Sequence, residues 1–330
     1  MRATNWIGDA VMSTPALRAV RETFPRAHIT VVANPLVAQM FACHPDCNEV
    51  LVFDKQGQHA GVPGFLRFVA MLRKRRFDCA ILFQNAIEAA IMAFLAGVPR
   101  RAGYTTDSRR LLLTHPVPVG VQERALHHTD YYLNMLAQCG VTTSLKEQCL
   151  ALAAEDIEWA TRHLPQGRFA VINPGAAYGS AKRWIPERFA AVADELADRY
   201  DLPIVLSGGP GEIETGQDIA KAMRTPHQNF IGQTNVCQMM ALLAASSLMI
   251  TNDSGPMHVA AAFGVPLVAI FGPTDHMTTS PWGTRAQIVR HPVECSPCLL
   301  RQCPIDHRCM LRVTVADVMS AVVDVVGDGP

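Results

Sequence analysis

Short apolar runs alternate with longer segments of helical periodicity along most of the 330 residues, and Gly or Pro marks many of the boundaries. The short runs predict strands at Ile29–Ala33, Glu49–Phe53, Asp78–Phe83, Phe169–Asn173, Ile204–Ser207 and Leu267–Phe271, and a further strand from Leu248. The longer segments predict helices that include Ala10–Thr23, Gly64–Arg75, His127–Cys139, Glu187–Tyr200, Ile213–Met223, Val236–Ala245 and Thr314–Val326. This alternation predicts an α/β fold with parallel, doubly wound sheets.

The alternation restarts near Ala153–Gly167, which predicts two domains of similar size, residues 1–160 and 161–330. We also consider that the last helix, 314–326, packs back on the N-terminal domain. A content of 49% hydrophobic and 18% charged residues suits two buried cores and argues against disorder. In such a tandem, a ligand is expected in the cleft between the domains, outside the carboxyl ends of the strands.

Composition narrows the cellular setting. No apolar run is long enough to span a bilayer, and the first residues lack a secretory pattern, so we expect a soluble chain. Ten cysteines spread through a large α/β sequence favour the reducing cytoplasm. Residues 1–150 hold 16 basic and 11 acidic side chains, and residues 151–330 hold 13 and 18. The basic front half suits an anionic partner, although such a surplus is commonly just a solvated surface.

One stretch carries the clearest chemical signal. An apolar run from Leu248 ends in Thr251-Asn252-Asp253-Ser254-Gly255-Pro256, and an Ala-rich segment then runs to Gly264. A strand, a turn and a helix start direct unpaired backbone N–H groups at one point, where the helix dipole adds positive charge. The pattern predicts a seat for a phosphate or diphosphate. The alternative is an ordinary turn capped by Asp253 or Ser254.

Five motifs resemble a known family when they are taken together. They are Asn5-Trp6-Ile7-Gly8-Asp9 with Ser13-Thr14-Pro15-Ala16-Leu17, Asn173-Pro174-Gly175, Lys182-Arg183-Trp184, Asn252-Asp253-Ser254-Gly255-Pro256-Met257-His258, and Phe271-Gly272-Pro273-Thr274. In this order and spacing the chain resembles the ADP-heptose:lipopolysaccharide heptosyltransferases of glycosyltransferase family 9, and within them the heptosyltransferase II group. Members usually begin with a fuller apolar strand, so either the first strand is short here or the true start lies upstream.

The resemblance implies a glycosyltransferase-B architecture of two Rossmann-like domains, with the acceptor on the first and the ADP-sugar on the second. It implies inverting, metal-independent transfer of heptose from ADP-heptose to the lipid-anchored inner core of lipopolysaccharide, with heptose I as the acceptor. The enzyme is then expected in the cytoplasm, peripheral to the inner membrane, with no nucleic acid partner and no required cofactor. The alternatives are heptosyltransferase I, another nucleotide-sugar enzyme of this architecture such as an epimerase, and a non-catalytic nucleotide-binding module.

Inverting transfer requires a base that removes the proton of the acceptor hydroxyl, and a loop carboxylate over the cleft suits that task. Asp9, directly after Gly8 at a helix start, matches the base proposed for the family. Its alternative role is a helix N-cap.

For the donor, we expect the Ser254-Gly255 backbone to hold the diphosphate and Lys182 to neutralise it. Asp253 is expected to face the sugar or to orient its loop. The remaining donor candidates are His258, Ser180 and Thr274 for the phosphates and Glu212 or Glu214 for the ribose. A surface lysine, a core histidine and a first-turn acid are the corresponding structural interpretations.

The acceptor carries phosphates and carboxylates, so basic side chains of the front half are its candidate ligands. We expect Arg100, Arg101, Arg109 and Tyr131 to contact it, with Arg110, His127, His128, Tyr132 and the Arg73–Arg76 run as further candidates. Solvated surface positions are the alternative for all of them.

Four cysteines, Cys295, Cys298, Cys303 and Cys309, lie within fifteen residues of one another, and His307 is nearby. Their spacing suits a tetrahedral structural zinc. The alternative, which the resemblance favours because its chemistry requires no metal, is a set of thiols that braces a long loop.

Overall fold

The computed structural model describes residues 1–283 and 285–326 and divides the chain into two compact units, Met1–Ala151 and the residues from Leu152 onward. The boundary falls after residue 151 rather than after residue 160. The physical reason is helix α8 (Ala154–His163), which packs against α11 (Val236–Ala245) of the second unit. No helix in the described part of the chain is both long and apolar enough to cross a membrane.

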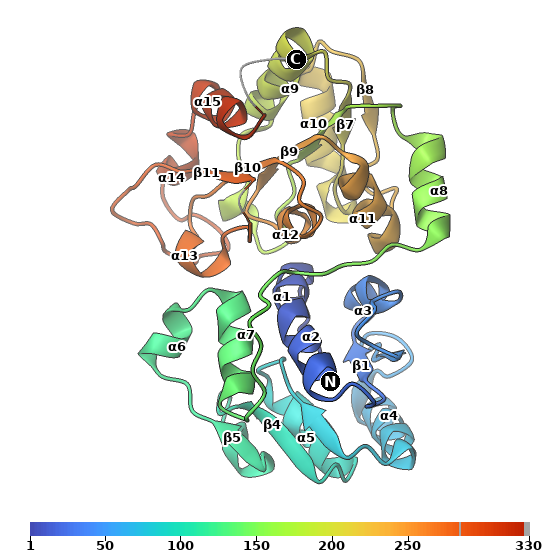
Figure 1. The fold of residues 1–330 in the computed structure, drawn as a ribbon. Coiled ribbons are helices and arrows are strands. Elements are labelled where there is room, and N and C mark those ends of the chain that lie inside the picture. The colour runs from blue at the N-terminus through green and yellow to red at the C-terminus, as the bar shows by residue number, and fades with distance from the viewer. Residues whose placement is uncertain (284, 327–330) are drawn as a thin grey trace. The chain divides into compact units, whose positions relative to one another are not determined.

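The N-terminal unit alternates short strands and helices (Figure 1). Its strands are β1 (Thr30–Ala33), β2 (Glu49–Val52), β3 (Cys79–Ile81), β4 (Arg100–Tyr104) and β5 (His115–Val117). Its helices are α1 (Ile7–Met12), α2 (Thr14–Thr23), α3 (Pro35–Phe41), α4 (Gly61–Arg75), α5 (Ile87–Leu95), α6 (Val121–Ala125) and α7 (His128–Ala137), with a 3-10 turn at Arg109–Leu112.

The strands of this unit form two parallel sheets, β1-β2 and β3-β4-β5, which are joined only at Arg2. Arg2 bridges to Val32 on one side and to Leu82 on the other, both in parallel. The order is therefore β2, β1, the Arg2 segment, β3, β4, β5, which is the order of a Rossmann-like sheet whose first strand is reduced to a bridge. The order reverses direction between the Arg2 segment and β3.

The N-terminal unit differs from the sequence-based prediction at several elements, of which the short helix α6 was not predicted at all. The predicted helix Ala10–Thr23 is two helices, since Ser13 lies between them and Pro15, with no N–H to donate, stands in the first turn of α2. Strand β4 was not predicted, because it opens on the charged pair Arg100-Arg101 and has only Ala102, Gly103 and Tyr104 as its buried part.

The C-terminal unit has a complete sheet. Its strands are β6 (Ala170–Asn173), β7 (Ile204–Leu206), β8 (His227–Asn229), β9 (Leu248–Asn252), β10 (Leu267–Ile270) and β11 (Ala286–Val289). Its helices are α8, α9 (Pro186–Tyr200), α10 (Ile213–Ala222), α11, α12 (Gly255–Ala262), α13 (His276–Thr279), α14 (Arg308–Leu311) and α15 (Val315–Val326), with 3-10 turns at Ser180–Lys182 and Pro210–Glu212.

All pairings in this sheet are parallel, and its order is β8-β7-β6-β9-β10-β11. In chain order this is 3-2-1-4-5-6, the order of a dinucleotide-binding sheet, so its direction reverses between β6 and β9. Strands β6, β9 and β10 are buried along their whole length, as expected for a parallel sheet covered on both faces.

Helices cover both faces of the C-terminal sheet. Helix α12 contacts β9 and β10, whereas α15 contacts β10, β11 and α9, and the two helices lie on opposite faces (Figure 1). Val318, Met319 and Val322 of α15 belong to the same buried cluster as Ile250 and Ile270 of the sheet. The suggestion that the last helix returns to the N-terminal domain does not describe these contacts, because its apolar face is used by the core of its own unit.

Candidate active site

The reversal point of the C-terminal sheet carries the predicted anion seat. Helix α12 starts at Gly255, directly after buried β9, and has Pro256 in its first turn. Ser254 is the N-cap residue but makes no side-chain capping bond in the structure as described; its hydroxyl lies 3.1 Å from that of Thr251. The side chain of the cap residue therefore does not occupy the first N–H groups of the helix, which lie at the positive end of its dipole.

A lysine and a buried carboxylate stand beside this helix start. Lys182 Nζ lies 2.6 Å from Asp253 Oδ2, and their side chains are only 13% and 5% exposed. The hydroxyl of Thr274 donates to the same Oδ2 at 2.6 Å. The ammonium also lies 5.1 Å from the centre of the Tyr178 ring. The Asp253 carboxylate, which Thr274 also holds, therefore keeps the Lys182 ammonium in a fixed position.

Asn252 ties the two strands at the reversal point together. Its amide nitrogen donates to the carbonyl of Pro174 at 2.7 Å, and its Oδ1 accepts from the backbone N–H of Trp184 at 3.1 Å. Trp184 is buried, and its indole N–H donates to Val313 O at 3.0 Å. These bonds join Asn173-Pro174-Gly175, Lys182-Arg183-Trp184 and the loop after β9 into one cluster.

Glu212 lies between two glycine turns at the carboxyl ends of β6 and β7. Its Oε2 accepts from the backbone N–H of Gly209 at 2.5 Å. A Cβ built on Gly175 would come within 2.3 Å of this carboxylate, and one on Gly208 within 2.7 Å. Only glycine permits so close an approach, and the burial that results raises the pKa of Glu212.

The other donor candidates have different exposures. Ser180 is exposed and opens the 3-10 turn that carries Lys182. His258 is 3% exposed and lies within α12. It is therefore placed as a core residue of the helix behind the anion seat.

In the N-terminal unit, a pocket of about 490 Å³ lies at the corresponding reversal point. Asp9 of α1 reaches it from the segment after Arg2, and Asn85 reaches it from the segment after β3. Tyr131, predicted as an acceptor ligand, lines the same pocket, and its hydroxyl accepts from Asn85 Nδ2 at 3.1 Å. Asp9 and Tyr131, which the sequence analysis assigned separately to the base and to the acceptor, therefore line one cavity.

Asp9 is held by two side chains of α7. Its Oδ1 lies 2.9 Å from His128 Nδ1 and accepts from the hydroxyl of Tyr132 at 3.3 Å. The N-cap of α1 is Trp6 rather than Asp9, so Asp9 does not cap the helix. The carboxylate is 24% exposed, which leaves it open to the pocket but partly screened from water.

Sequence reasoning missed several residues of this pocket. They are Asn85, Thr106, Asp107, Val119 and Arg124. Asn85 and Thr106 follow the carboxyl ends of adjacent parallel strands, and their side chains are hydrogen-bonded at 3.2 Å. Their positions just after the carboxyl ends of β3 and β4 are the signal that could have identified Asn85 and Thr106. Strand β4 was not predicted, so this signal was incomplete.

The prediction that Arg109 contacts the acceptor is wrong. This residue was expected on the acceptor surface, but its side chain has no exposed area. Its guanidinium donates to the carbonyls of Tyr104 at 2.7 Å and Leu82 at 3.4 Å, to that of Gln84, and to Asn85 Oδ1 at 3.2 Å. Burial lowers its pKa to about 10. Arg109 therefore fastens the loops that shape the pocket and cannot itself meet an acceptor.

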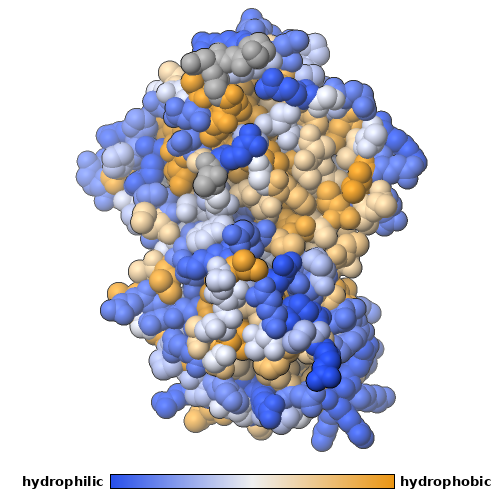
Figure 2. All heavy atoms as spheres, viewed as in Figure 1, coloured by the Kyte–Doolittle hydropathy of each residue, from blue (hydrophilic) through white to orange (hydrophobic). Residues whose placement is uncertain are grey.

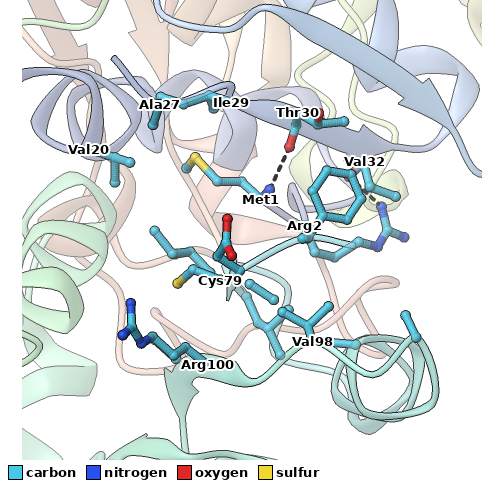
Figure 3. A pocket seen from close by; sticks show the side chains of 18 of the residues that line it. Met1, Arg2, Val20, Ala27, Ile29, Thr30, Val32, Cys79, Val98 and Arg100 are labelled. Carbon is cyan, nitrogen blue, oxygen red and sulfur yellow. Dashed lines mark hydrogen bonds between the residues drawn. The ribbon is translucent and has the colours of Figure 1, made fainter. Parts of the chain in front are cut away.

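Arg100 and Arg101 lie at the amino end of β4, whereas the Asp9 pocket is at the carboxyl ends. Arg101 donates to the carbonyls of Leu112 and Val98 at 2.6 and 2.5 Å. Arg100 lines a different, largely apolar cavity of about 730 Å³, shown in Figure 3, where the ammonium of Met1 donates to Thr30 O. Neither arginine is positioned to bind a ligand in the Asp9 pocket.

Exposed basic side chains remain elsewhere on the N-terminal unit. The Arg73–Arg76 run at the end of α4 is exposed, and hydrophilic residues cover most of the surface seen in Figure 2. The front-half basic surplus is thus mostly a solvated face.

The loop that contains the four cysteines, residues 295–309, is hydrogen-bonded to the segment 178–182, which ends at Lys182. All four thiols are free, and burial, followed by the proximity of the other three, raises the pKa of Cys309. Among the described residues, no group of three or more His, Cys, Asp or Glu side chains is arranged to hold a metal ion. Instead, Arg301 O accepts from Ala181 N at 3.0 Å, and Leu299 O accepts from the Tyr178 hydroxyl at 2.9 Å.

The two Rossmann-like units, each with a sheet order that reverses beside its first strand, are those of a glycosyltransferase of the glycosyltransferase-B architecture. The family model "Glycosyltransferase family 9 (heptosyltransferase)" matches residues 65–308. The chain belongs to glycosyltransferase family 9, and the resemblance drawn from the motifs is confirmed.

Curated relatives and solved structures agree with this assignment. Lipopolysaccharide heptosyltransferase 2 of Escherichia coli is 29% identical over 87% of this chain and 86% of its own length. Lipooligosaccharide heptosyltransferase 2 of Campylobacter jejuni is 28% identical over 92% of both chains. A family 9 glycosyltransferase from Veillonella parvula has a TM-score of 0.88 at 25% identity, covering 98% of this chain and 95% of that one. Heptosyltransferase II of Escherichia coli has a TM-score of 0.82, also at 25% identity, covering 98% and 97%.

Proposed function

We propose that this protein transfers heptose from ADP-heptose to heptose I of the inner core of lipopolysaccharide, with inversion and without a metal. Membership of family 9 supports the reaction class. The similarity to several heptosyltransferases 2 supports the heptosyltransferase II type. The observation that carries the proposal is the cationic seat at the start of α12, where Lys182 is held 2.6 Å from Asp253.

The seat suits the leaving group of this reaction. When the bond from the sugar carbon to the diphosphate breaks, ADP departs with an additional negative charge. Backbone N–H groups at the start of α12 and the Lys182 ammonium stabilise this charge without a metal ion. Glu212, between the Gly175 and Gly208 turns, is the candidate to accept hydrogen bonds from the ribose hydroxyls.

The N-terminal unit supplies the opposite chemistry. The acceptor hydroxyl must lose a proton as its oxygen attacks the sugar carbon. The Asp9 carboxylate, which lines the pocket, is the candidate to accept this proton. Arg124, which lines the same pocket, is the candidate to bind an anionic group of the acceptor.

The acceptor is a membrane lipid, so we further propose that the enzyme works in the cytoplasm at the surface of the inner membrane. The excess of basic over acidic side chains in residues 1–150 supports this, since anionic headgroups attract such surfaces.

The test is incubation of the purified protein with ADP-heptose and lipopolysaccharide cores truncated before and after heptose I. Mass spectrometry of the cores is the readout, and released ADP is measured in parallel. The proposal predicts one added heptose on the core that ends in heptose I and none on the shorter core. Addition to the shorter core instead would indicate heptosyltransferase I activity. Loss of donor with no gain of mass in any core would contradict transfer.

A further inference from the structure

The loop of residues 295–309, which connects β11 to α14 (Figure 1), is fastened to the segment that ends at Lys182. Ala181 N donates to Arg301 O at 3.0 Å. A Cβ built on Gly179 would lie 2.2 Å from the same Arg301 O, so the two backbones are in direct contact there. The position of Arg301 is therefore fixed relative to the Lys182 side of the anion seat at the start of α12.

The same loop is also fastened to the segment that leads into Thr274. The backbone N–H groups of Cys298 and Leu299 both donate to Pro273 O, at 3.0 and 2.9 Å. The Thr274 hydroxyl and the Lys182 ammonium bond the same buried carboxylate oxygen. The loop is thus attached to both of the segments that hold this carboxylate, beside the anion seat.

Arg301 brings a second cation to this place. The Cζ atom of its guanidinium lies 5.2 Å from the centre of the Tyr178 ring, and the Lys182 ammonium lies 5.1 Å from the same centre. The Tyr178 hydroxyl donates to Leu299 O at 2.9 Å, which holds the ring against the loop. Both cations are therefore placed beside one aromatic ring, whose face attracts positive charge.

The two cations differ in how their charge is compensated. Lys182 has the Asp253 carboxylate at 2.6 Å, whereas Arg301 is exposed and forms no ion pair within the part of the chain that the structure describes. Two cations beside one ring, with a carboxylate for only one of them, favour an anion that contacts both. A planar guanidinium suits phosphate oxygens in particular, because it can donate two parallel hydrogen bonds to them.

We propose that Arg301 binds the diphosphate of the donor nucleotide together with Lys182, and that the loop of residues 295–309 positions it for this task; this inference rests on the proposed function. The ligand class is a nucleoside diphosphate or its sugar ester. Asp253 offsets much of the Lys182 charge, so the uncompensated charge of Arg301 supplies the attraction that the seat otherwise lacks. It also stabilises the negative charge that ADP gains as it leaves.

The test compares Arg301→Met with Arg301→Lys in the full-length enzyme by isothermal titration of ADP. Methionine keeps an unbranched side chain against Tyr178 but has no charge, whereas lysine keeps the charge. We expect Arg301→Met to bind ADP about 10-fold more weakly than the wild type, because one charge-assisted contact is lost. Arg301→Lys should stay within about threefold of the wild type, since it still attracts the diphosphate.

Two controls accompany this comparison. Arg312→Met changes an exposed arginine that directly follows α14, and its ADP affinity should stay within about twofold of the wild type. Adenosine, which has no phosphate, should bind the wild type and Arg301→Met equally. Added salt should weaken ADP binding less in Arg301→Met than in the wild type, because one charged contact fewer is screened.

A merely structural role of Arg301 gives a different result. The bond to Ala181 uses the backbone of residue 301, so every variant keeps it. If the side chain only packs on Tyr178, Arg301→Met binds ADP as tightly as Arg301→Lys does, and this result overturns the inference. An equal loss of affinity for adenosine and ADP overturns it as well. Circular dichroism and Tm establish that the variants fold.

Heptose transfer, measured with the same preparations, separates this inference from the proposed function. If the wild type transfers heptose but Arg301→Met binds ADP as the wild type does, the inference fails alone. If ADP binding depends on Arg301 but the wild type adds heptose to no core, the proposed function fails and the contact between Arg301 and the diphosphate stands.

Discussion

The two units share one sheet order but differ in what stands where that order reverses. In the C-terminal unit the reversal point presents helix N–H groups and the Lys182 ammonium. In the N-terminal unit it presents a carboxylate, an imidazole and two phenols. Under the proposed function, the topology places a ligand at each reversal point, and the side chains there determine whether a leaving group is stabilised or a nucleophile is deprotonated.

The units also differ in the strand at the centre. Strand β6 pairs on both sides along its length, whereas in the N-terminal unit only Arg2 bridges both neighbours. Asp9 nevertheless reaches its pocket, because α1 follows this segment directly and contacts α7. The position of the acid therefore depends on helix packing more than on a full central strand.

The comparison predicts the largest effect for Asp9→Asn. Because this carboxylate acts in the N-terminal unit, its loss should lower kcat on the order of 10²–10⁴ and leave ADP affinity within twofold. Steady-state kinetics with calorimetric titration of ADP measures both quantities. Near-normal turnover would remove Asp9 from the mechanism, and a large loss of ADP affinity would contradict the division of labour.

A second prediction separates two cations that look alike in sequence. Arg109 is wholly buried and bonded to several carbonyls, so Arg109→Met should lower the free energy of unfolding by about 3 kcal/mol or more, because those acceptors lose their donor. Arg110→Met, at the exposed neighbouring position, is the control and should change it by less than about 0.5 kcal/mol. Urea denaturation provides the measurement. Equal stability of the two variants would contradict the structural role of Arg109.

The smallest predicted effect concerns Lys182→Ala. Removing the ammonium takes one charged contact from the diphosphate and leaves the buried Asp253 carboxylate without its cationic partner, so ADP should bind about 10- to 100-fold more weakly. Lys182→Arg keeps the charge and should recover part of the affinity. Isothermal titration with ADP is the measurement, and unchanged affinity in the alanine variant would argue against the seat.

The region around α12 in the C-terminal unit was predictable because its signals are local, whereas the edge strands β8 and β11 of the same sheet were not predicted. The strand from Leu248, the helix start at Gly255 and the glycine after α12 are read from adjacent residues, and the structure confirms all three elements. The bond between Lys182 and Asp253 was not foreseen. These residues are 71 positions apart, and each was assigned separately to the ligand.

The N-terminal unit was harder to predict, since its site depends on contacts between distant segments. His128 and Asp9 are 119 positions apart, and the pairing requires α7 to pack on α1. Arginine is usually found at the surface, so only the tertiary structure shows that Arg109 is buried. Strand β4 begins with two arginines, so its pattern hid the end where Thr106 lines the pocket.

The most direct test of this account is a crystal structure of the enzyme with ADP. The account predicts that the diphosphate accepts hydrogen bonds from the backbone at the start of α12 and lies within contact of Lys182 Nζ. A nucleotide bound instead in the pocket of Asp9 and His128 would contradict the assignment of leaving-group stabilisation to the C-terminal unit and of proton removal to the N-terminal one.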